Sequence, residues 1–186
     1  MQAHDVLDHA QPRLMSRDEY DRLVAAGMFE NERVELIRGI VVRISPAGPA
    51  HADPIDVLNR HFVRALGDRA VVRVQLPFAA SEDSEPEPDL ALVPPRRYAD
   101  RHPHQAFLVI EVADTSLAHD RETKGPIYAS SGVPEYWIVD VNARTVSLYD
   151  TISAGRYTRT RQLKAGARIA PASFPDAALD VAELFV

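Results

Sequence analysis

The sequence predicts an α/β fold of the α+β kind, in which a mixed β-sheet is flanked by helices. Two apolar runs, at residues 90–93 and 108–113, lack the alternation of a half-exposed strand and are typical of strands buried on both faces. Segments with a helical pattern, at 51–67 and 114–131, separate the strand patterns. A chain of 186 residues is long enough for one domain with a sizeable core. We therefore expect a single domain over residues 1–186.

The N-terminal part predicts a short helix and a hairpin that are additions to the main sheet. The segment Ser16–Glu19 is a capping box, so a helix is expected to run from there to Ala26. Residues 33–45 then predict two strands around a tight turn at Arg38-Gly39.

The central part predicts the first helix of the core and three strands. An apolar stripe runs along residues 51–67, and Asp53-Pro54 suits the start of that helix. A strand is expected over residues 70–78. It is followed by an acid-rich approach to a strand that opens with Asp89, and then by the strand at 108–113.

The C-terminal part predicts a second helix and a β-meander. The helix over 114–131 contains Pro126, which has no N–H for the carbonyl of Glu122, so we expect a kink beside Lys124. The remaining expected elements are strands at 135–141, 144–150 and 156–163 and a capped turn at 180–183.

Composition limits the classes of protein to consider. No apolar run reaches membrane-spanning length, and residues 1–12 lack the order of a signal peptide, so we expect a cytoplasmic protein that does not enter a membrane. The chain has no cysteine, which excludes disulfides and thiolate metal sites. A net charge of −6 argues mildly against a protein that coats nucleic acid. The basic stretch at 156–168 is interpreted first as a solvated hairpin face, and second as a phosphate-contacting patch.

Two carboxylates and one lysine are predicted to converge at one edge of the sheet. Glu111 lies within an apolar strand, where an ionised carboxylate is costly unless a cation or hydrogen-bond donors meet it. Asp89 lies four positions before Val93, and Glu111 lies four positions after Phe107. If the two strands are antiparallel neighbours, this symmetry sets the acids opposite one another on one face. With Lys124 nearby, the pattern indicates a divalent-metal site.

Several of these residues also have simpler interpretations. Glu35 could be an exposed strand acid, and Asp120 and Lys124, four apart on a helix, could form a plain surface pair. Against the second interpretation, lysines occur only at 124 and 164 among 21 basic residues. His51 and His61 are expected to be structural. The loop histidines His102 and His104 are expected to be solvated, although that loop could also reach a phosphate backbone.

The order helix, three strands, helix, strand over residues 51–141 resembles the core of the PD-(D/E)XK nucleases. More specifically, the chain resembles the Uma family (Uma-two) of proposed endonucleases. The matching segments are Glu35-Leu36-Ile37-Arg38-Gly39, Pro88-Asp89-Leu90-Ala91-Leu92-Val93, Ile110-Glu111-Val112-Ala113-Asp114, Asp120-Arg121-Glu122-Thr123-Lys124 and Gly132-Val133-Pro134-Glu135-Tyr136-Trp137-Ile138-Val139-Asp140. The resemblance implies a restriction-endonuclease-like fold with its nuclease core at about 51–141.

The resemblance also implies a site. Asp89 and Glu111, with the carbonyl of Val112, would hold Mg²⁺ (or Mn²⁺). Lys124 would be the catalytic lysine, and Glu35 would be an added acid. The wider superfamily places its lysine two residues after the glutamate, where this chain has an alanine, whereas the Uma family takes its lysine from the following helix.

Two functions follow from the sequence. The first is a metal-dependent endonuclease that hydrolyses DNA phosphodiester bonds, in which Glu35, Asp89, Glu111 and Lys124 are catalytic. The alternative is an inactive member of the same fold that binds DNA or another protein. A homodimer is expected, because cutting both strands of a duplex needs two sites. A serine hydrolase is excluded because the chain has no Gly-x-Ser-x-Gly motif.

Overall fold

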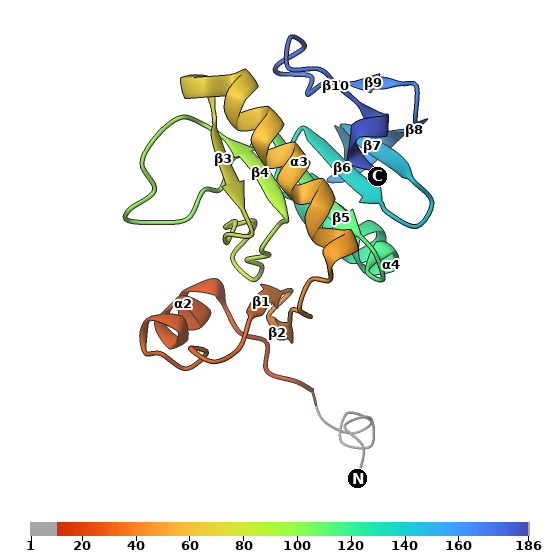
Figure 1. Cartoon of the computed structure of the whole chain (residues 1–186). Coiled ribbons are helices and arrows are strands. Elements are labelled where there is room, and N and C mark those ends of the chain that lie inside the picture. Colours follow the sequence, from red (N-terminus) through yellow and green to blue (C-terminus); the bar gives the residue numbers. More distant parts are fainter. Residues whose placement is uncertain (1–10, 186) are drawn as a thin grey trace.

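The computed structural model describes residues 11–185; the N-terminal segment examined for a signal peptide falls largely outside this range. The fold is built on a six-stranded sheet with the strand order β3-β4-β5-β6-β7-β8 (Figure 1). Neighbouring strands are antiparallel except β5 and β6, which are parallel. The strands are β3 (Val71–Val74), β4 (Leu90–Val93), β5 (Leu108–Ala113), β6 (Glu135–Asp140), β7 (Thr145–Ser153) and β8 (Arg156–Lys164). The predicted mixed sheet is confirmed.

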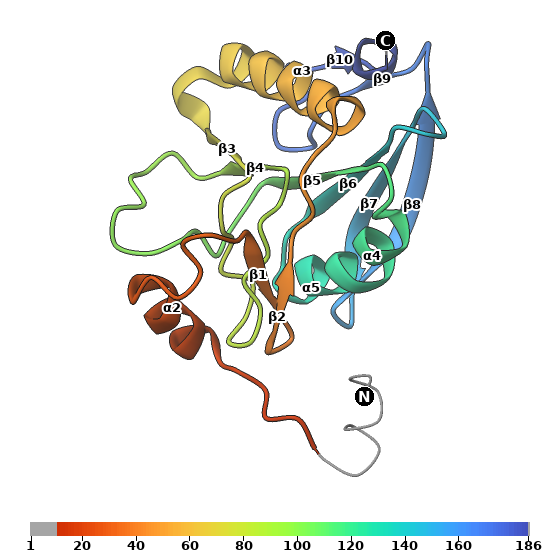
Figure 2. The ribbon, with the colours of Figure 1, turned by 60° about the horizontal axis from the view of Figure 1, so that its bottom comes forward.

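Helices cover both faces of the sheet. The long helix α3 (Pro49–Leu66) lies on one face, and α4 (Leu117–His119) and α5 (Gly125–Ser130) lie on the other (Figure 2). Alternation along β4 divides its side chains between two cores: Leu90 and Leu92 pack under α3, whereas Ala91 and Val93 pack with Tyr128 of α5. Strands β4 and β5 are buried throughout, as their unbroken apolar runs predict.

Helix α3 begins earlier than the sequence suggested. Its first residue is Pro49, after the N-cap Gly48, two residues before the expected start at His51, and Asp53-Pro54 lies inside the helix rather than at its start. Pro49 takes the first helical position, where a missing N–H costs nothing, and Pro54 lies inside the helix. His51 lies in the first turn of this helix.

The connection between β5 and β6 is a helix with a wide turn in its middle. Between α4 and α5, residues Asp120–Lys124 form a π-helical turn, and Gly125 donates its N–H to the carbonyl of Asp120, five residues back. The expected kink beside Lys124 is present in this form. Pro126 lies at the start of α5, where its missing N–H is tolerated. The helical part starts at Leu117, three residues later than expected.

The N-terminal additions pack beside the segment that leads into β4. Helix α2 (Arg17–Ala25) has the predicted capping box, and β1 (Val34–Ile37) and β2 (Ile40–Arg43) form the predicted hairpin. The hairpin is joined to the segment before β4 by an antiparallel bridge between Leu36 and Glu85. This bridge brings β1 next to the start of β4.

The C-terminal meander of β7 and β8 is also confirmed, as is the capped turn, a 3₁₀ helix at Val181–Leu184 that Asp180 caps. A short pair, β9 (Arg168–Ile169) and β10 (Leu179–Asp180), was not expected. Strand β3 is shorter than the predicted 70–78, because Gln75 adopts a left-handed conformation with φ of 48° that ends it. Within residues 11–185, no helix is both long and apolar enough to cross a membrane.

Candidate active site

Asp89 and Glu111 lie opposite one another on neighbouring antiparallel strands. The register of β4 and β5 pairs Leu90 with Ile110, so the next pair outward is Asp89 and Glu111. The N–H of Asp89 donates to Oε2 of Glu111 over 3.3 Å, and the N–H of Val112 donates to Oδ2 of Asp89 over 2.9 Å. Both carboxylates therefore occupy the same face and the same site, as their spacing from the connecting loop predicted.

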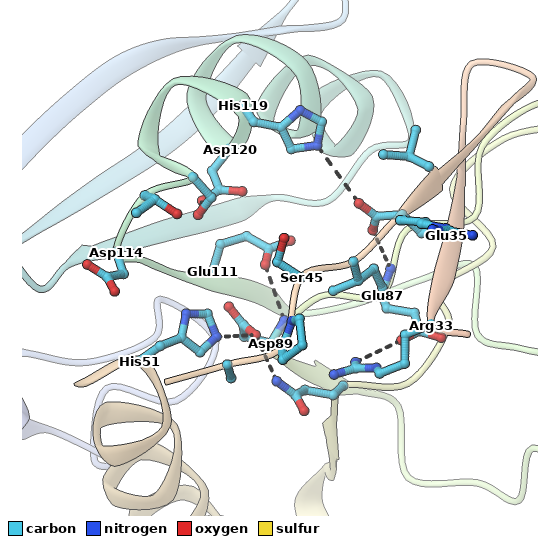
Figure 3. Close-up of a pocket in the computed structure, with 18 of the residues that line it drawn as sticks. Arg33, Glu35, Ser45, His51, Glu87, Asp89, Glu111, Asp114, His119 and Asp120 are labelled. Atoms are coloured by element: carbon cyan, nitrogen blue, oxygen red, sulfur yellow. Dashed lines mark hydrogen bonds and ion pairs between the residues drawn. The ribbon is translucent and has the colours of Figure 1, made fainter. Parts of the chain in front are cut away.

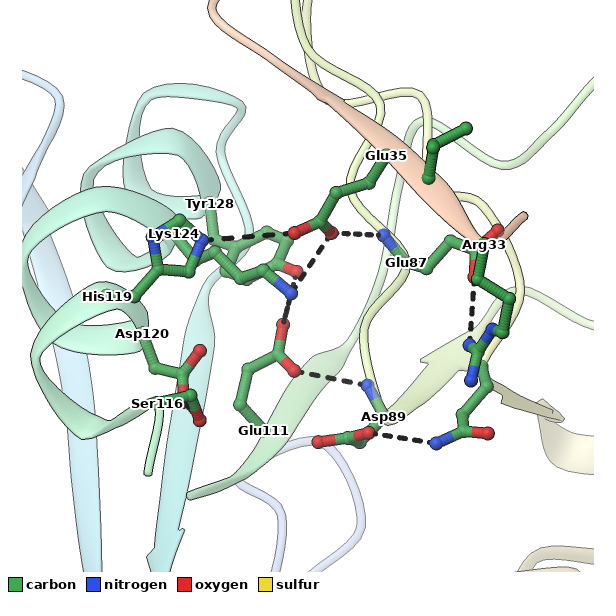
Figure 4. Close-up of polar contacts among 12 residues, drawn as sticks. Arg33, Glu35, Glu87, Asp89, Glu111, Ser116, His119, Asp120, Lys124 and Tyr128 are labelled. Atoms are coloured by element: carbon green, nitrogen blue, oxygen red, sulfur yellow. Dashed lines mark hydrogen bonds and ion pairs between the residues drawn. The ribbon is translucent and has the colours of Figure 1, made fainter. Parts of the chain in front are cut away.

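Lys124 lies between two of the predicted acids. Its Nζ is 3.2 Å from Oε1 of Glu111 and 3.1 Å from Oε2 of Glu35, and only 8% of its side chain is exposed (Figure 4). The alternative of a surface pair with Asp120 is wrong, because Asp120 is itself buried and accepts a hydrogen bond from Ser116. The wide turn at Asp120–Lys124 positions the lysine so that it points into the fold.

Glu35 is buried, which rules out the interpretation as an exposed strand acid. It is 4% exposed, because β1 packs between α2 and the segment before β4. Its Oε2 accepts a hydrogen bond from the N–H of Glu87 over 3.1 Å, and Nε2 of His119 lies 3.8 Å from Oε1. The hairpin thus adds a third carboxylate to the pair on β4 and β5.

Two histidines of the site were not expected from the sequence. His51 had been expected to be structural, but its Nε2 lies 3.0 Å from Oδ1 of Asp89 (Figure 3). Gln75 donates to the same oxygen over 3.2 Å. His119 extends from α4 toward Glu35, and its spacing from the predicted acids gave no sign of this contact. By contrast, His61 contacts the carbonyl of Ala177, which fits its expected structural role.

One cavity of about 370 Å³ is lined by the three predicted acids, the lysine, Gln75 and the two histidines His51 and His119. The four predicted side chains all line it, whereas Val112 does not line it and contributes its N–H to Oδ2 of Asp89. Arg33 and Arg43 of the hairpin side form part of its wall, and residues 44–48 lead from the hairpin into α3 beside it. The cavity combines buried acids with basic groups nearer the surface. In this arrangement the acids can hold a cation at the bottom of the cavity, and the basic groups can hold an anion near its mouth.

Comparison with known proteins agrees with this geometry. A model of the Uma2 family, described as "Putative restriction endonuclease", matches residues 17–182. The chain belongs to the Uma2 family. A similar solved structure is described as "Crystal structure of a putative nuclease belonging to DUF820 from Anabaena variabilis ATCC 29413". It superposes with a TM-score of 0.73 at 18% identity, over 94% of this chain and 98% of that chain, which establishes a common fold. No curated protein matches the chain.

The expected family is therefore confirmed, and so is the restriction-endonuclease-like fold. Family and fold together indicate a nuclease of the restriction-endonuclease-like class. Nucleases of this class generally use divalent metal ions, and a nuclease family is expected to bind DNA.

Burial and pairing shift the pKa values of the acids in the candidate site in opposite directions. Burial alone would raise the pKa of Glu35, but His119, Lys124 and the N–H of Glu87 outweigh it and lower the pKa below its usual value. Burial would likewise raise the pKa of Asp89, and the contact with His51 turns this into a lowering. Both groups are therefore carboxylates at neutral pH.

Glu111 and Lys124 form the most deeply buried charged pair of the described chain. Burial raises the pKa of Glu111 well above its usual value, with Asp89 adding to the rise and Lys124 opposing it. Burial alone would lower the pKa of Lys124, but Glu111 and Glu35 more than compensate, so its pKa is raised and the ammonium stays charged. Tyr128 completes the environment of Glu111 by donating to Oε1 over 2.7 Å.

The donor set suits a hard divalent cation. Mg²⁺ is commonly bound by one or two carboxylates together with waters and a phosphate oxygen, rather than by a cage of protein groups alone. Within residues 11–185, no three His, Asp or Glu side chains form such a cage. Asp89 and Glu111 supply two neighbouring carboxylates that open to a cavity with room for water. The residues present therefore fit Mg²⁺ or Mn²⁺.

Proposed function

We propose that this Uma2 protein is a divalent-metal-dependent endonuclease that hydrolyses phosphodiester bonds of DNA. The observation that carries the proposal is the single buried cluster formed by Asp89, Glu111, Lys124 and Glu35. Structural ion pairs are seldom built from three acids and one lysine at the bottom of a cavity, because removing these charges from water is costly. A function that uses the charges accounts for that cost.

Asp89 and Glu111 are the proposed metal ligands, together with the carbonyl of Val112. Bound there, Mg²⁺ (or Mn²⁺) supplies Lewis-acid activation of water and neutralises charge on the phosphate. The backbone N–H of Val112 holds Oδ2 of Asp89, and the N–H of Asp89 holds Oε2 of Glu111. These two contacts fix the orientation of both carboxylates before substrate arrives.

Lys124 is the proposed catalytic lysine. Its ammonium has three N–H donors, and Glu35 and Glu111 accept from two sides. The remaining donor orients the attacking water or stabilises the negative charge that develops on the phosphate. Glu35 orients Lys124 from the hairpin. Arg33 and Arg43, on the wall of the cavity, pair with Glu87 and Glu32, and they would contact the neighbouring phosphates by exchanging these partners.

The alternative is an inactive module of the same fold that binds DNA or another protein. The net charge of −6 favours it, since DNA-binding proteins generally carry a basic surface. The complete set of four buried site residues favours the nuclease. A homodimer with one site for each DNA strand, and a cytoplasmic location beside its substrate, belong to the same proposal.

The deciding experiment incubates purified protein with single-stranded and double-stranded DNA in Mg²⁺ or Mn²⁺. We expect cleavage by the parent protein and none by Lys124→Ala. Lys124→Arg should fail as well, because a planar guanidinium does not replace a compact ammonium. Lys164→Ala, at the exposed end of β8, is the matched control and should cleave like the parent. DNA binding by the parent without cleavage in either metal would establish the inactive module instead.

A further inference from the structure

A second cavity lies between α5 and the β-meander, away from the candidate active site. Its volume is about 180 Å³, and three tyrosines of three strands contribute to its lining: Tyr136, Tyr149 and Tyr157. The ring centroids of Tyr136 and Tyr157 are 6.1 Å apart with the planes 17° from parallel, and Tyr149 lies 5.7 Å from Tyr136. The cavity therefore has aromatic walls.

The hydroxyls of two of these tyrosines are already engaged within the protein. Tyr136 donates to the carbonyl of Asp120 over 3.1 Å, and Tyr157 donates to the carbonyl of Val133 over 2.8 Å. These bonds fix both rings. What the cavity presents to a ligand is therefore ring surface from Tyr149 and Tyr157, both of which are partly exposed.

Two exposed arginines flank the rings. Arg121 extends from the wide turn and Arg156 from the first position of β8, and both line the cavity. Arg121 donates to the hydroxyl of Tyr149 over 3.3 Å. Over residues 11–185, neither guanidinium has a carboxylate within ion-pair distance, in contrast to Arg159 and Arg161, which pair with Asp150. The site thus has uncompensated positive charge beside aromatic surface.

This combination identifies a class of ligand. A flat aromatic group is held by ring stacking, and an anion next to it is held by guanidinium groups. The cavity is smaller than the roughly 300–1,000 Å³ of sites for drug-sized ligands, so it suits one base and not a longer stretch of bases. Thr160 at its rim adds a hydroxyl that can donate to or accept from a base edge.

We propose that this cavity binds one nucleotide unit, with the base stacked on Tyr149 and Tyr157 and the phosphate on Arg121 and Arg156. The same chemistry occurs in a free mononucleotide and in one unit of a DNA strand. Arg121 and Lys124 belong to the same turn, but Arg121 lines this cavity and Lys124 lines the candidate active site.

The experiment measures binding of dAMP and of a ten-residue oligo(dT) to the full chain by titration calorimetry, in EDTA so that no strand is cut. The variants are Tyr149→Leu, Tyr149→Phe and Arg156→Gln. Tyr149→Leu removes the ring and Arg156→Gln removes the charge, so each should weaken binding about tenfold. Tyr149→Phe keeps the ring and should bind like the parent. Arg60→Gln, at an exposed position of α3 on the opposite face of the sheet, is the control and should also bind like the parent.

Each probe identifies one source of the ligand. Binding of dAMP that Tyr149→Leu and Arg156→Gln weaken indicates a free-nucleotide site. Binding of oligo(dT) alone, with the same dependence, indicates a unit of a strand. Equal affinities in the parent, Tyr149→Leu and Arg156→Gln, or no binding of either probe by the parent, would overturn the proposal. Because Arg156 is exposed, its variant keeps the test valid even if Tyr149→Leu does not fold. Asp89→Asn should bind as the parent does, which separates this site from the candidate active site.

Discussion

Lys124 connects the N-terminal hairpin to the main sheet, since its Nζ lies 3.1 Å from Glu35 of β1 and 3.2 Å from Glu111 of β5. The lysine therefore has a structural role in addition to its proposed chemical one, and the two roles can be measured separately.

The first prediction concerns the stability that Lys124 provides. Lys124→Met should lower the free energy of unfolding by about 3–5 kcal/mol, because it leaves two buried carboxylates without their cation. Urea denaturation at pH 7 measures the change. Lys164→Met, at an exposed position, should stay within about 0.5 kcal/mol of the parent. Equal stability of the two variants would mean that Lys124 is not paired as described.

The second prediction concerns metal binding. Mg²⁺ or Mn²⁺ should raise the melting temperature of the parent, because an ion that binds only the folded state stabilises it. Asp89→Asn should lose most of this rise, since it removes one of the two carboxylates among the proposed ligands. Asp176→Asn, whose carboxylate is exposed and pairs with Arg69, should keep it. A metal-induced rise that persists in Asp89→Asn would locate the ion elsewhere.

The third prediction concerns the hydroxyl of Tyr128. Tyr128→Phe removes the donor that lies 2.7 Å from Glu111 and should destabilise the fold by about 1–3 kcal/mol, because a buried carboxyl oxygen loses a hydrogen-bond partner. Tyr98→Phe also loses one hydrogen bond, to the carbonyl of Pro94, but in a partly exposed loop where water can replace it. Denaturation of the two variants side by side should give the larger loss for Tyr128.

The fourth prediction concerns pH and Glu85, a buried acid outside the candidate site. Burial raises the pKa of Glu85 to about 7, and Asp21 and Glu87 add to the rise while Arg17 opposes it. The folded protein therefore holds this proton more tightly than the unfolded chain, whose glutamate has a pKa near 4.5. The resulting stabilisation is full below about pH 4.5 and is lost as the pH rises through 7.

Glu85→Gln tests this dependence, because the amide cannot ionise. Relative to the parent, the variant should gain stability between pH 5 and pH 8, by about 3 kcal/mol at most. Urea denaturation at several pH values measures the difference. Glu183→Gln, at an exposed position, is the control. A difference between Glu85→Gln and the parent that does not change with pH would show that Glu85 titrates at the same pH in both states.

The carboxylate pair could be predicted from sequence because its geometry depends on strand periodicity alone. Equal spacing of Asp89 and Glu111 from one connecting loop determines both their register and their common face. Lys124 could be predicted only in part: Pro126 indicated an irregular helix, but a proline pattern does not distinguish a kink from a π-helical turn.

The histidines and the burial of Glu35 depend on contacts between distant segments, which local patterns do not contain. His51 lies in the first turn of α3 and reaches Asp89 of the segment that opens β4, a contact that the helical pattern of residues 51–67 does not indicate. Glu35 lies in a hairpin that resembles any exposed ribbon until the bridge from Leu36 to Glu85 joins it to the approach to β4. Conversely, β4 to β7 were predictable since each carries its own apolar pattern, whereas β8, which is polar and largely exposed, was predictable only as the partner of β7 in a meander.

Strand β8 forms one border of the sheet, and its composition has a consequence for self-association. A free border offers peptide groups to any second strand, including β8 of another molecule. A two-fold antiparallel pairing centred on Thr160 would place Arg156 of one molecule opposite Lys164 of the other, and like charges so placed repel. Continuous twelve-stranded sheets formed by this pairing of β8 with β8 are disfavoured by this arrangement. Any homodimer of this protein should therefore be sought on another surface.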